Sequence, residues 1–248
     1  MSDSGTTTST FPRSSSSAAG AGTPADPLLL PGGVRALWTG RAQGDLGQGA
    51  HDVGVPARRR EVVDLPWTWA RQVHGATVLA VDAGHLGPDP VPDADALVGG
   101  PHCDRALAVF TADCAPLALS SPEGVMAAVH VGWRGLVAGV VPAAVSAMRA
   151  AGASEVSGAL GPCIRVCCYE FGAADLAVVE DAAGGHFSGV TTGGRPALDL
   201  AAAVHAVAGR SGVEVVFDAE ACTACGGSWF SHRARQEKER QALVVWQS

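Results

Sequence analysis

Positive charge is scarce in this 248-residue sequence. Lysine and arginine total 17 against 24 aspartates and glutamates, so the formal net charge is −7. Proteins that bind nucleic acids or anionic membranes without specificity need an excess of basic side chains. The densest basic stretch, residues 233–240, is interleaved with acidic and amide residues, which favours a solvated face. We therefore expect neither nucleic acid nor a membrane as a partner.

Long apolar runs and a secretory leader are also missing. Residues 28–30 are too few to span a bilayer, and the apolar stretch 136–153 is short and interrupted by Pro142 and Arg149. The amino-terminal region has no basic start followed by an apolar core. The seven cysteines are odd in number and unevenly spaced, which does not suggest a disulfide framework. We expect a soluble, cytoplasmic protein with reduced thiols.

The common nucleotide-binding and hydrolase motifs are absent. The sequence contains no G-x-x-x-x-G-K-[ST] loop, no G-x-G-x-x-G turn and no G-x-S-x-G elbow. Aromatic residues make up only 5% and charged residues 17%, whereas 47% are apolar, so the chain can still form a globular core. Any chemistry must therefore come from other residues.

The most reactive side chains cluster around two apolar runs. Residues 106–110 and 124–131 have the composition of buried strands. The first leads to a polar turn that carries Cys114, and the second ends with His130 before a Gly132-Trp133-Arg134-Gly135 turn. Side chains at the ends of strands are held rigidly and are common in active sites. The sequence thus predicts a thiol and an imidazole at neighbouring strand ends.

A second histidine, His74, completes a candidate metal site. Cysteine and histidine are ligands of zinc, and the set His74, Cys114 and His130 would leave one coordination position open, as in catalytic zinc sites. The same cysteine and histidines also form a possible nucleophile–base pair. A plainer alternative is a buried cysteine with two core histidines, since no local ligand pair joins the three. The residues alone leave these alternatives open.

The other cysteines lie in two groups. Cys222 and Cys225 have C-x-x-C spacing, but no second such pair or paired histidines accompany them. Cys163, Cys167 and Cys168 lie far upstream. We interpret all five as incidental buried thiols and not as a structural metal site.

The chain is expected to fold as one domain behind a tail. Residues 1–30 are predicted to be a disordered tail, because their Ser/Thr/Ala/Gly/Pro composition buries little, and residues 31–248 a catalytic domain. Further strands are expected at 33–39, 77–81, 94–98, 157–160, 213–217 and 243–246. Helices are expected in the first half of 56–69 and at 136–150, 173–182 and 198–209, with a loop at 184–195. Several strands have no helix between them, so we predict an α/β or α+β domain with mixed sheets.

Six short motifs occur in an order that resembles a known family. They are Arg71-Gln72-Val73-His74-Gly75, Ala94-Asp95-Ala96-Leu97-Val98, Thr111-Ala112-Asp113-Cys114-Ala115-Pro116, His130-Val131-Gly132-Trp133-Arg134-Gly135, Gly161-Pro162-Cys163-Ile164 with Tyr169-Glu170, and Phe230-Ser231-His232-Arg233. The chain resembles, from about Gly33 to Trp246, the laccase-domain family. That family was long labelled multicopper polyphenol oxidase and is described as zinc-dependent purine nucleoside phosphorylases.

The resemblance implies a fold, a cofactor and substrates. The implied fold is a layered α/β/β/α single domain with mixed β-sheets. The implied metal ligands are His74, Cys114 and His130, with Zn²⁺ as the ion and copper as an alternative. The implied reaction is phosphorolysis of adenosine, inosine and methylthioadenosine, with some adenosine deamination. A bacterial branch is instead described as a cytoplasmic peptidoglycan-editing amidase that acts on a UDP-muramyl amino acid.

Substrate and proton-transfer residues are less clearly indicated. Arg41 and Arg134 adjoin glycine turns and are our candidates for binding phosphate, although Arg134 can equally pair with Asp113 or Asp95. Asp113 is our catalytic acid/base candidate beside Cys114 and His130, with Asp95 and Glu170 as alternatives. Asp95 can also serve as a hydrogen-bond partner of a histidine ligand.

The sequence departs from the family pattern in two places. The loop at residues 41–47 lacks the usual asparagine, and Lys238-Glu239-Arg240 stands where T-G-R is expected. Three hypotheses follow: a zinc enzyme of purine nucleosides, an amidase or cysteine hydrolase that uses Cys114, and a non-catalytic protein with a structural metal. The oligomeric state is not indicated.

Overall fold

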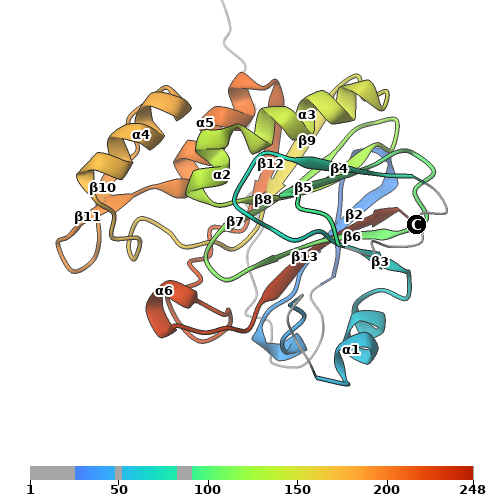
Figure 1. Ribbon diagram of the computed structural model, residues 1–248, viewed down its shortest axis with the longest axis horizontal. Coiled ribbons are helices and arrows are strands. Elements are labelled where there is room, and N and C mark those ends of the chain that lie inside the picture. The colour runs from blue at the N-terminus through green and yellow to red at the C-terminus, as the bar shows by residue number, and fades with distance from the viewer. Residues whose placement is uncertain (1–25, 48–51, 83–90, 248) are drawn as a thin grey trace, which may run out of the picture.

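The protein is built from two stacked β-sheets with helices on both outer faces. The computed structural model describes residues 26–47, 52–82 and 91–247. A layer of helices lies over one sheet, and one helix lies against the other (Figure 1). This arrangement confirms the predicted α/β/β/α layering with mixed sheets.

The six-stranded sheet carries most of the candidate site. Its strand order is β12-β9-β7-β8-β5-β4. The strands are β4 (Val78–Val81), β5 (Ala96–Gly99), β7 (Ala115–Ser120), β8 (Met126–Val131), β9 (Val156–Leu160) and β12 (Val213–Asp218). The outer pairs β12–β9 and β4–β5 are parallel, and the inner pairs are antiparallel.

The five-stranded sheet has the order β1-β2-β13-β6-β3. Its strands are β1 (Leu28–Leu29), β2 (Val34–Trp38), β3 (Trp67–Thr68), β6 (Ala106–Thr111) and β13 (Gln241–Gln247). Only β3–β6 is parallel. A separate hairpin joins β10 (Ser188–Val190) to β11 (Pro196–Leu198).

The helices complete the layers. The six-stranded sheet is covered by α2 (Trp133–Ala138), α3 (Val140–Ala150) and α5 (Leu200–Arg210), and α4 (Ala173–Ala183) packs against α2 and α5. On the far side lies α1 (Val55–Val62), and the short α6 (His232–Arg235) precedes β13 (Figure 1). Single 3₁₀ turns occupy Pro31–Gly33 and Arg41–Gln43. None of the described helices is long and apolar enough to cross a bilayer.

The side chains of strand β8 alternate between the two faces of the six-stranded sheet. Side chains alternate across a strand, so Ala127 and Val129 pack against the helices while Met126 and Ala128 pack between the two sheets. All six residues of β8 are buried because both faces are covered. By the same alternation His130 falls on the inter-sheet side, at the end of the strand.

Two predictions of secondary structure are wrong, one for a helix and one for a loop. The expected helix at 136–150 is two helices, because Gly139 adopts a left-handed φ of 88° that ends α2. The expected loop at 184–195 contains β10, which pairs with β11. No element was predicted for residues 115–120, which form the central strand β7.

The predicted tail also ends earlier than expected. Leu28 and Leu29 form β1 against β2, and Leu30 is buried. The prediction that residues 28–30 belong to a disordered tail is therefore wrong. Residues 1–25 lie outside the described part of the chain, so for them the tail stays a prediction.

Candidate metal centre and active site

Adjacent antiparallel strands position the first two candidate ligands. Cys114 immediately precedes β7 and His130 lies near the end of β8, where Pro116 pairs with His130. The period of two places both side chains on the inter-sheet side of the six-stranded sheet. His130 is almost fully buried, whereas Cys114 is partly exposed. The thiol thus faces an opening and the imidazole lies behind it.

The buried carboxylate of Asp95 places both histidines. Its Oδ1 lies 2.8 Å from Nδ1 of His130 and accepts the backbone N–H of His74 at 2.9 Å. Its Oδ2 accepts the backbone N–H groups of Val73 and Gly75 at 3.2 and 2.7 Å. Because Nδ1 of His130 faces this acceptor, we assign the proton to Nδ1, which leaves Nε2 for a metal or for the thiol. Asp95 therefore both supports a histidine and caps the turn that carries His74.

A second set of hydrogen bonds fixes the His74 turn to the sheet. The side-chain amide of Gln72 donates to the carbonyl oxygen of Phe110 at 2.7 Å and accepts the N–H of Phe110 at 2.8 Å. His74 itself has a left-handed φ of 59°, which is unfavourable for a residue with a Cβ. The hydrogen bonds of Gln72 and Asp95 hold this conformation.

The three candidate ligands converge to within coordination reach. One side-chain donor atom from each of His74, Cys114 and His130 lies within 4.8 Å of the others. Cys114 Sγ is 3.7 Å from His74 Nε2, and the two imidazole rings are 4.8 Å apart at an interplanar angle of 74°. One thiolate and two imidazoles suit zinc, and also copper. The residues therefore fit the metal that the family resemblance implies.

Gly132 makes room for this convergence. A Cβ at this position would lie 2.6 Å from Cδ2 of His74 and 3.1 Å from Sγ of Cys114. Both distances are shorter than ordinary van der Waals contact. The first glycine of the Gly132-Trp133-Arg134-Gly135 turn is thus required by the ligands beside it.

The thiol of Cys114 and the buried imidazole of His130 favour each other's charged forms. Burial opposes ionisation of Cys114, but the charge and hydrogen bonds of His130 and His74 outweigh it and lower the pKa of Cys114 to about 6. Burial likewise opposes charge on His130, but the thiolate and Asp95 raise the pKa of His130 to about 9. Near neutral pH the site thus holds a thiolate beside an imidazolium.

The three residues open onto a cavity of ≈ 720 Å³. Its walls include aromatic side chains, backbone of the Cys114 turn and several cations. The lining residues are Asp45, Gly47, Gln72, His74, Phe110, Thr111, Ala112, Asp113, Cys114, His130, Trp133, Arg134, Tyr169, His232, Arg233, Lys238 and Arg240. This volume lies in the range of cavities that bind small organic molecules.

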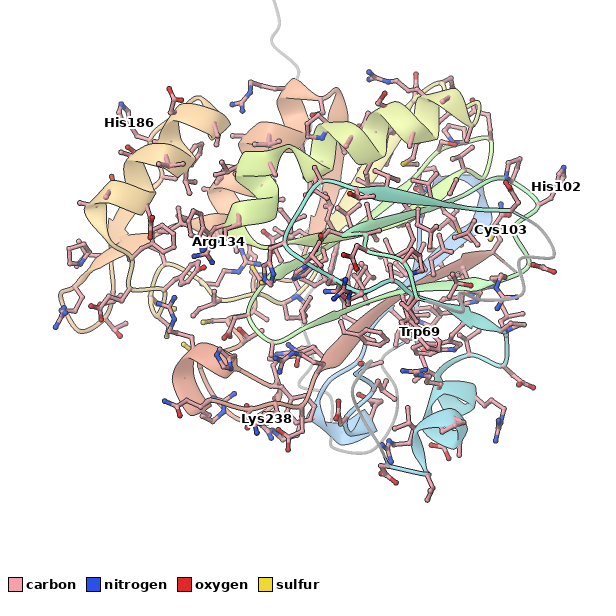
Figure 2. The ribbon with its side chains drawn as sticks, viewed as in Figure 1. Trp69, His102, Cys103, Arg134, His186 and Lys238 are labelled. Atoms are coloured by element: carbon pink, nitrogen blue, oxygen red, sulfur yellow. The ribbon has the colours of Figure 1, made fainter. Side chains whose placement is uncertain are left out.

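Two cations of the cavity are free to bind an anion. The side chains of Arg134 and Lys238 have no hydrogen-bond or ion-pair partner among the described residues. Arg134 only stacks on Trp133, with its guanidinium carbon 4.3 Å from the ring centroid. Arg134 lies at the start of α2 and Lys238 in the segment after α6, so the two cations of the cavity come from distant parts of the sequence (Figure 2).

The second arginine predicted to bind substrate is used elsewhere. Arg41 donates hydrogen bonds to the carbonyl oxygens of Gly227 and Trp229 and forms an ion pair with Glu237 at 2.5 Å. It is not among the residues that line the cavity. Arg41 thus holds the 227–237 segment in the structure, and its role in binding substrate stays a prediction.

The acid/base candidates are also engaged by protein groups. Asp113, which has a left-handed φ of 104°, accepts the hydroxyl of Thr223 at 2.7 Å and the backbone N–H of Arg233 at 2.6 Å. Glu170 pairs with Arg195 and does not line the cavity. Asp113 lines the cavity and positions two segments there; its predicted catalytic role stays a prediction.

Sequence reasoning missed part of the cavity wall. Residues 233–240 are exposed or half-buried, which confirms the interpretation as a solvated face, but Arg233, Lys238 and Arg240 of this stretch also line the cavity, which was not predicted. Tyr169 was also missed as a lining residue; it stacks under the guanidinium of Arg233 at 4.8 Å. Both residues could have been noticed in the sequence, because Tyr169 and Arg233 belong to the six motifs that resemble the laccase-domain family.

Comparison with known proteins identifies the relatives of this chain. Residues 50–248 match the family described as multi-copper polyphenol oxidoreductase laccase. A purine nucleoside phosphorylase of Streptomyces coelicolor is 45% identical over 72% of this chain and 74% of its own length. One from Mycobacterium tuberculosis is 36% identical over 77% of each chain.

Solved structures show the same fold. The chain resembles protein NMB0706 of Neisseria meningitidis with a TM-score of 0.75 at 28% identity, over 89% of this chain and 97% of the other. YlmD of Geobacillus stearothermophilus gives a TM-score of 0.75 at 24% identity, over 87% and 92%. On the strength of the match to most of its length and of these relatives, the chain belongs to the multi-copper polyphenol oxidoreductase laccase family.

Proposed function

We propose that the protein is a zinc-dependent purine nucleoside phosphorylase that acts on adenosine, inosine and methylthioadenosine. The observation that carries this proposal is the meeting of His74, Cys114 and His130 at the wall of a cavity that also holds unpaired cations. The names of the relatives from Streptomyces coelicolor and Mycobacterium tuberculosis support it.

The cavity offers separate partners for the two substrates. Arg134 and Lys238 supply positive charge for phosphate, and a guanidinium binds phosphate oxygens in a bidentate manner. Phe110, Trp133 and Tyr169 supply apolar ring surface for a purine or ribose. The cavity is large enough to hold a nucleoside and phosphate side by side.

In phosphorolysis a phosphate oxygen bonds to C1′ of the ribose as the C1′–N9 bond breaks. The purine leaves with the bonding electrons and takes up a proton, which gives the free base and ribose 1-phosphate. In our proposal Arg134 and Lys238 hold the phosphate, and His74, Cys114 and His130 hold the metal. Zinc bound there would supply Lewis acidity to a substrate oxygen. Asp95 accepts the Nδ1 proton of His130 and so orients Nε2 toward the place where the metal would bind.

The direct test combines metal analysis with a product assay. We expect purified protein to contain zinc and to release adenine from adenosine only when phosphate is present. The same samples should be analysed for inosine, because the family resemblance also implies deamination. Adenine release that is independent of phosphate, or no release from any of the three nucleosides by zinc-loaded protein, would contradict the proposal.

Arg134 provides a prediction specific to phosphate. Replacing Arg134 by Ala should raise the KM for phosphate about 10- to 100-fold, because a charge-assisted hydrogen bond contributes about 1.5–3 kcal/mol. The KM for adenosine should change much less. Arg60→Ala, an exposed arginine on α1, is the matched control and should behave like the wild type. Equal rises in both KM values would argue against a phosphate role.

A second candidate function rests on the thiolate–imidazolium pair of Cys114 and His130. Such a pair is the arrangement of a cysteine hydrolase, here an amidase on a UDP-muramyl amino acid. A thiolate bound to zinc is no longer a free nucleophile, so the two functions respond oppositely to metal. Amino-acid release from a UDP-muramyl substrate by metal-free protein, with inhibition by zinc, would favour the amidase.

A further inference from the structure

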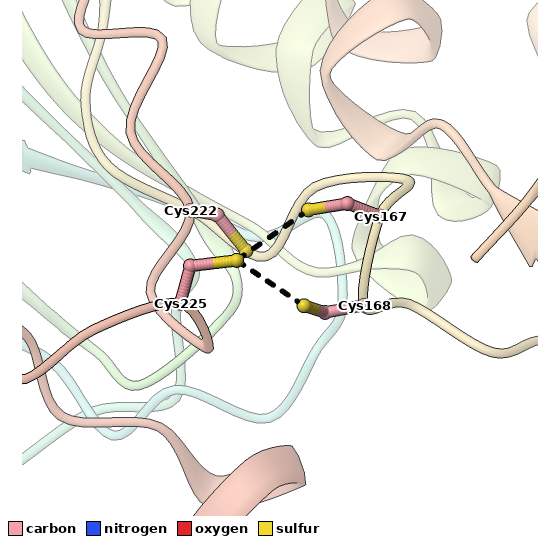
Figure 3. A group of neighbouring side chains, drawn as sticks. All are labelled: Cys167, Cys168, Cys222 and Cys225. Carbon is pink, nitrogen blue, oxygen red and sulfur yellow. Dashed lines mark hydrogen bonds between the residues drawn. The ribbon is translucent and has the colours of Figure 1, made fainter. Parts of the chain in front are cut away.

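Four cysteine thiols that are scattered in the sequence meet at one place. Cys167 and Cys168 lie in a turn between β9 and α4, and Cys222 and Cys225 lie in the segment after β12. One sulfur atom from each lies within 4.8 Å of the others. Figure 3 shows the two pairs pointing toward one another from opposite segments. The interpretation of these cysteines as incidental buried thiols is wrong: none of the four is buried.

The spacing of the sulfurs suits one tetrahedral ion. Zinc–sulfur bonds of about 2.3 Å place the corners of a tetrahedron about 3.8 Å apart. The Sγ of Cys225 lies 3.7 Å from that of Cys167 and 3.4 Å from that of Cys168. All four cysteines are free thiols in the structure. These distances between sulfur atoms are much longer than the bond of about 2.05 Å in a disulfide.

The backbone brings the two segments together independently of the thiols. Cys163 and Cys222 form a parallel β-bridge, in which the N–H of Cys163 donates to Ala221 at 3.2 Å and the N–H of Thr223 donates to Cys163 at 3.1 Å. The backbone N–H of Arg165 donates to the Sγ of Cys222 at 3.4 Å. A sulfur that accepts a backbone N–H is better able to carry negative charge, as a metal-bound thiolate must.

Hydrophobic packing explains the cluster only in part, because Cys168 and Cys222 pack against the core whereas Cys167 and Cys225 are not among its residues. Cysteines that act as small apolar residues are buried in the core, as Cys103 and Cys163 are here. Cys225 is exposed, and Cys167, Cys168 and Cys222 are half-buried. Four thiols held together near solvent match the pattern of a closed, structural zinc site.

We propose that Cys167, Cys168, Cys222 and Cys225 bind one zinc ion in a structural site distinct from the site of His74, Cys114 and His130. Binding is a ligand exchange without oxidation: each thiol that is still protonated releases its proton as its sulfur bonds the ion. The two sites share no residue. The proposal does not depend on the phosphorylase activity.

The position of the cluster suggests that the ion would stabilise part of the cavity. Thr223, next to Cys222, donates to Asp113 at 2.7 Å, and Tyr169, next to Cys168, lines the cavity under Arg233. An ion at the cluster would tie the segment of Tyr169 to the segment of Thr223, and so hold Tyr169 and Asp113 in the wall of the cavity. We therefore expect its loss to loosen that wall and to lower stability.

Metal content tests the proposal. Protein purified under reducing conditions should contain two zinc ions per chain. The Cys222→Ser/Cys225→Ser variant and the His74→Ala/Cys114→Ser variant should each contain one, since each retains the site that the other lacks. X-ray absorption at the zinc edge of the His74→Ala/Cys114→Ser variant should show four sulfur neighbours at about 2.3 Å.

Several outcomes would overturn the proposal. Unchanged metal content in the Cys222→Ser/Cys225→Ser variant would do so. So would an intact mass that is lower by two hydrogens, which would show a disulfide among the four under reducing conditions. If the Cys222→Ser/Cys225→Ser variant does not fold, X-ray absorption of the His74→Ala/Cys114→Ser variant decides alone, and a zinc-free spectrum or one without four sulfurs contradicts the site. Failure of phosphorolysis in the assay above would leave each of these readouts unaffected.

Discussion

At the scale of single residues, the missing side chain of Gly132 decides whether the ligands can meet. We predict that Gly132→Ala lowers zinc affinity at the His74 site at least tenfold, because the new Cβ would displace the ring of His74. Titration with a zinc chelator of known affinity measures the change. Gly100→Ala is the control, because a Cβ there meets no atom within 4 Å. Unchanged affinity in the Gly132 variant would show that His74 is not a ligand.

The titration of Cys114 gives a second prediction at this scale. Its pKa of about 6 lies below the ordinary thiol value, so in metal-free protein the reactive thiolate is present above pH 6 and is lost as the pH falls through 6. The rate of alkylation by iodoacetamide, followed at the Cys114 peptide by mass spectrometry, should therefore have its midpoint near pH 6. His130→Gln removes the charge that contributes most to lowering the pKa of Cys114, so the midpoint should move to higher pH.

A midpoint near the ordinary thiol value in the wild-type protein would contradict the ion pair. Addition of zinc should suppress the reaction in the wild type at neutral pH, because a bound thiolate is shielded from the reagent.

The candidate ligands could be identified from the sequence, but the residues that position them could not. His74, Cys114 and His130 were indicated by their residue types at strand ends, and the structure brings them together. The roles of Gln72 and Gly132 depend on atoms far away in the sequence. The thiol cluster was misjudged for the same reason, since the contact of Cys167 with Cys225 exists only after β9 and β12 pair.

At the scale of elements, one side chain caps the first turn of helix α5. Asp199 accepts the backbone N–H of Ala202 at 3.0 Å and so satisfies one free donor of the first turn. We predict that Asp199→Ala lowers the free energy of unfolding by about 1 kcal/mol, measured by urea denaturation. Asp175→Ala in α4 is the control, because that helix has no side-chain cap. Equal losses in both variants would argue against the cap.

Strand β7 shows why some elements escape prediction. Pro116 has no N–H, and proline in the middle of a sheet usually argues against a strand. Here it is the second residue of a central strand, and its carbonyl oxygen still accepts the N–H of Gly161 at 2.9 Å. The split between α2 and α3 was missed because an isolated glycine is often tolerated within a helix, whereas Gly139 adopts a left-handed conformation.

At the scale of the whole molecule, the apolar layer between the two sheets holds the fold together. Leu243 of β13 is fully buried in that layer, among residues of both sheets. We predict that Leu243→Ala lowers the free energy of unfolding by about 2–5 kcal/mol. Leu29→Ala on β1 is the matched control: its side chain is 64% exposed, and it should change stability by less than about 0.5 kcal/mol. Similar losses in the two variants, measured by guanidinium denaturation, would contradict this assignment.

The place of β13 in the strand order has a consequence during synthesis. β13 lies between β2 and β6, yet it is made after both of them and after the entire six-stranded sheet. Until residues 241–247 leave the ribosome, β2 and β6 each present an open edge with unpaired N–H and carbonyl groups, which is a template for aggregation. A nascent chain stalled just before this strand would therefore need a chaperone to shield those edges, although most of its candidate metal ligands would already be in place.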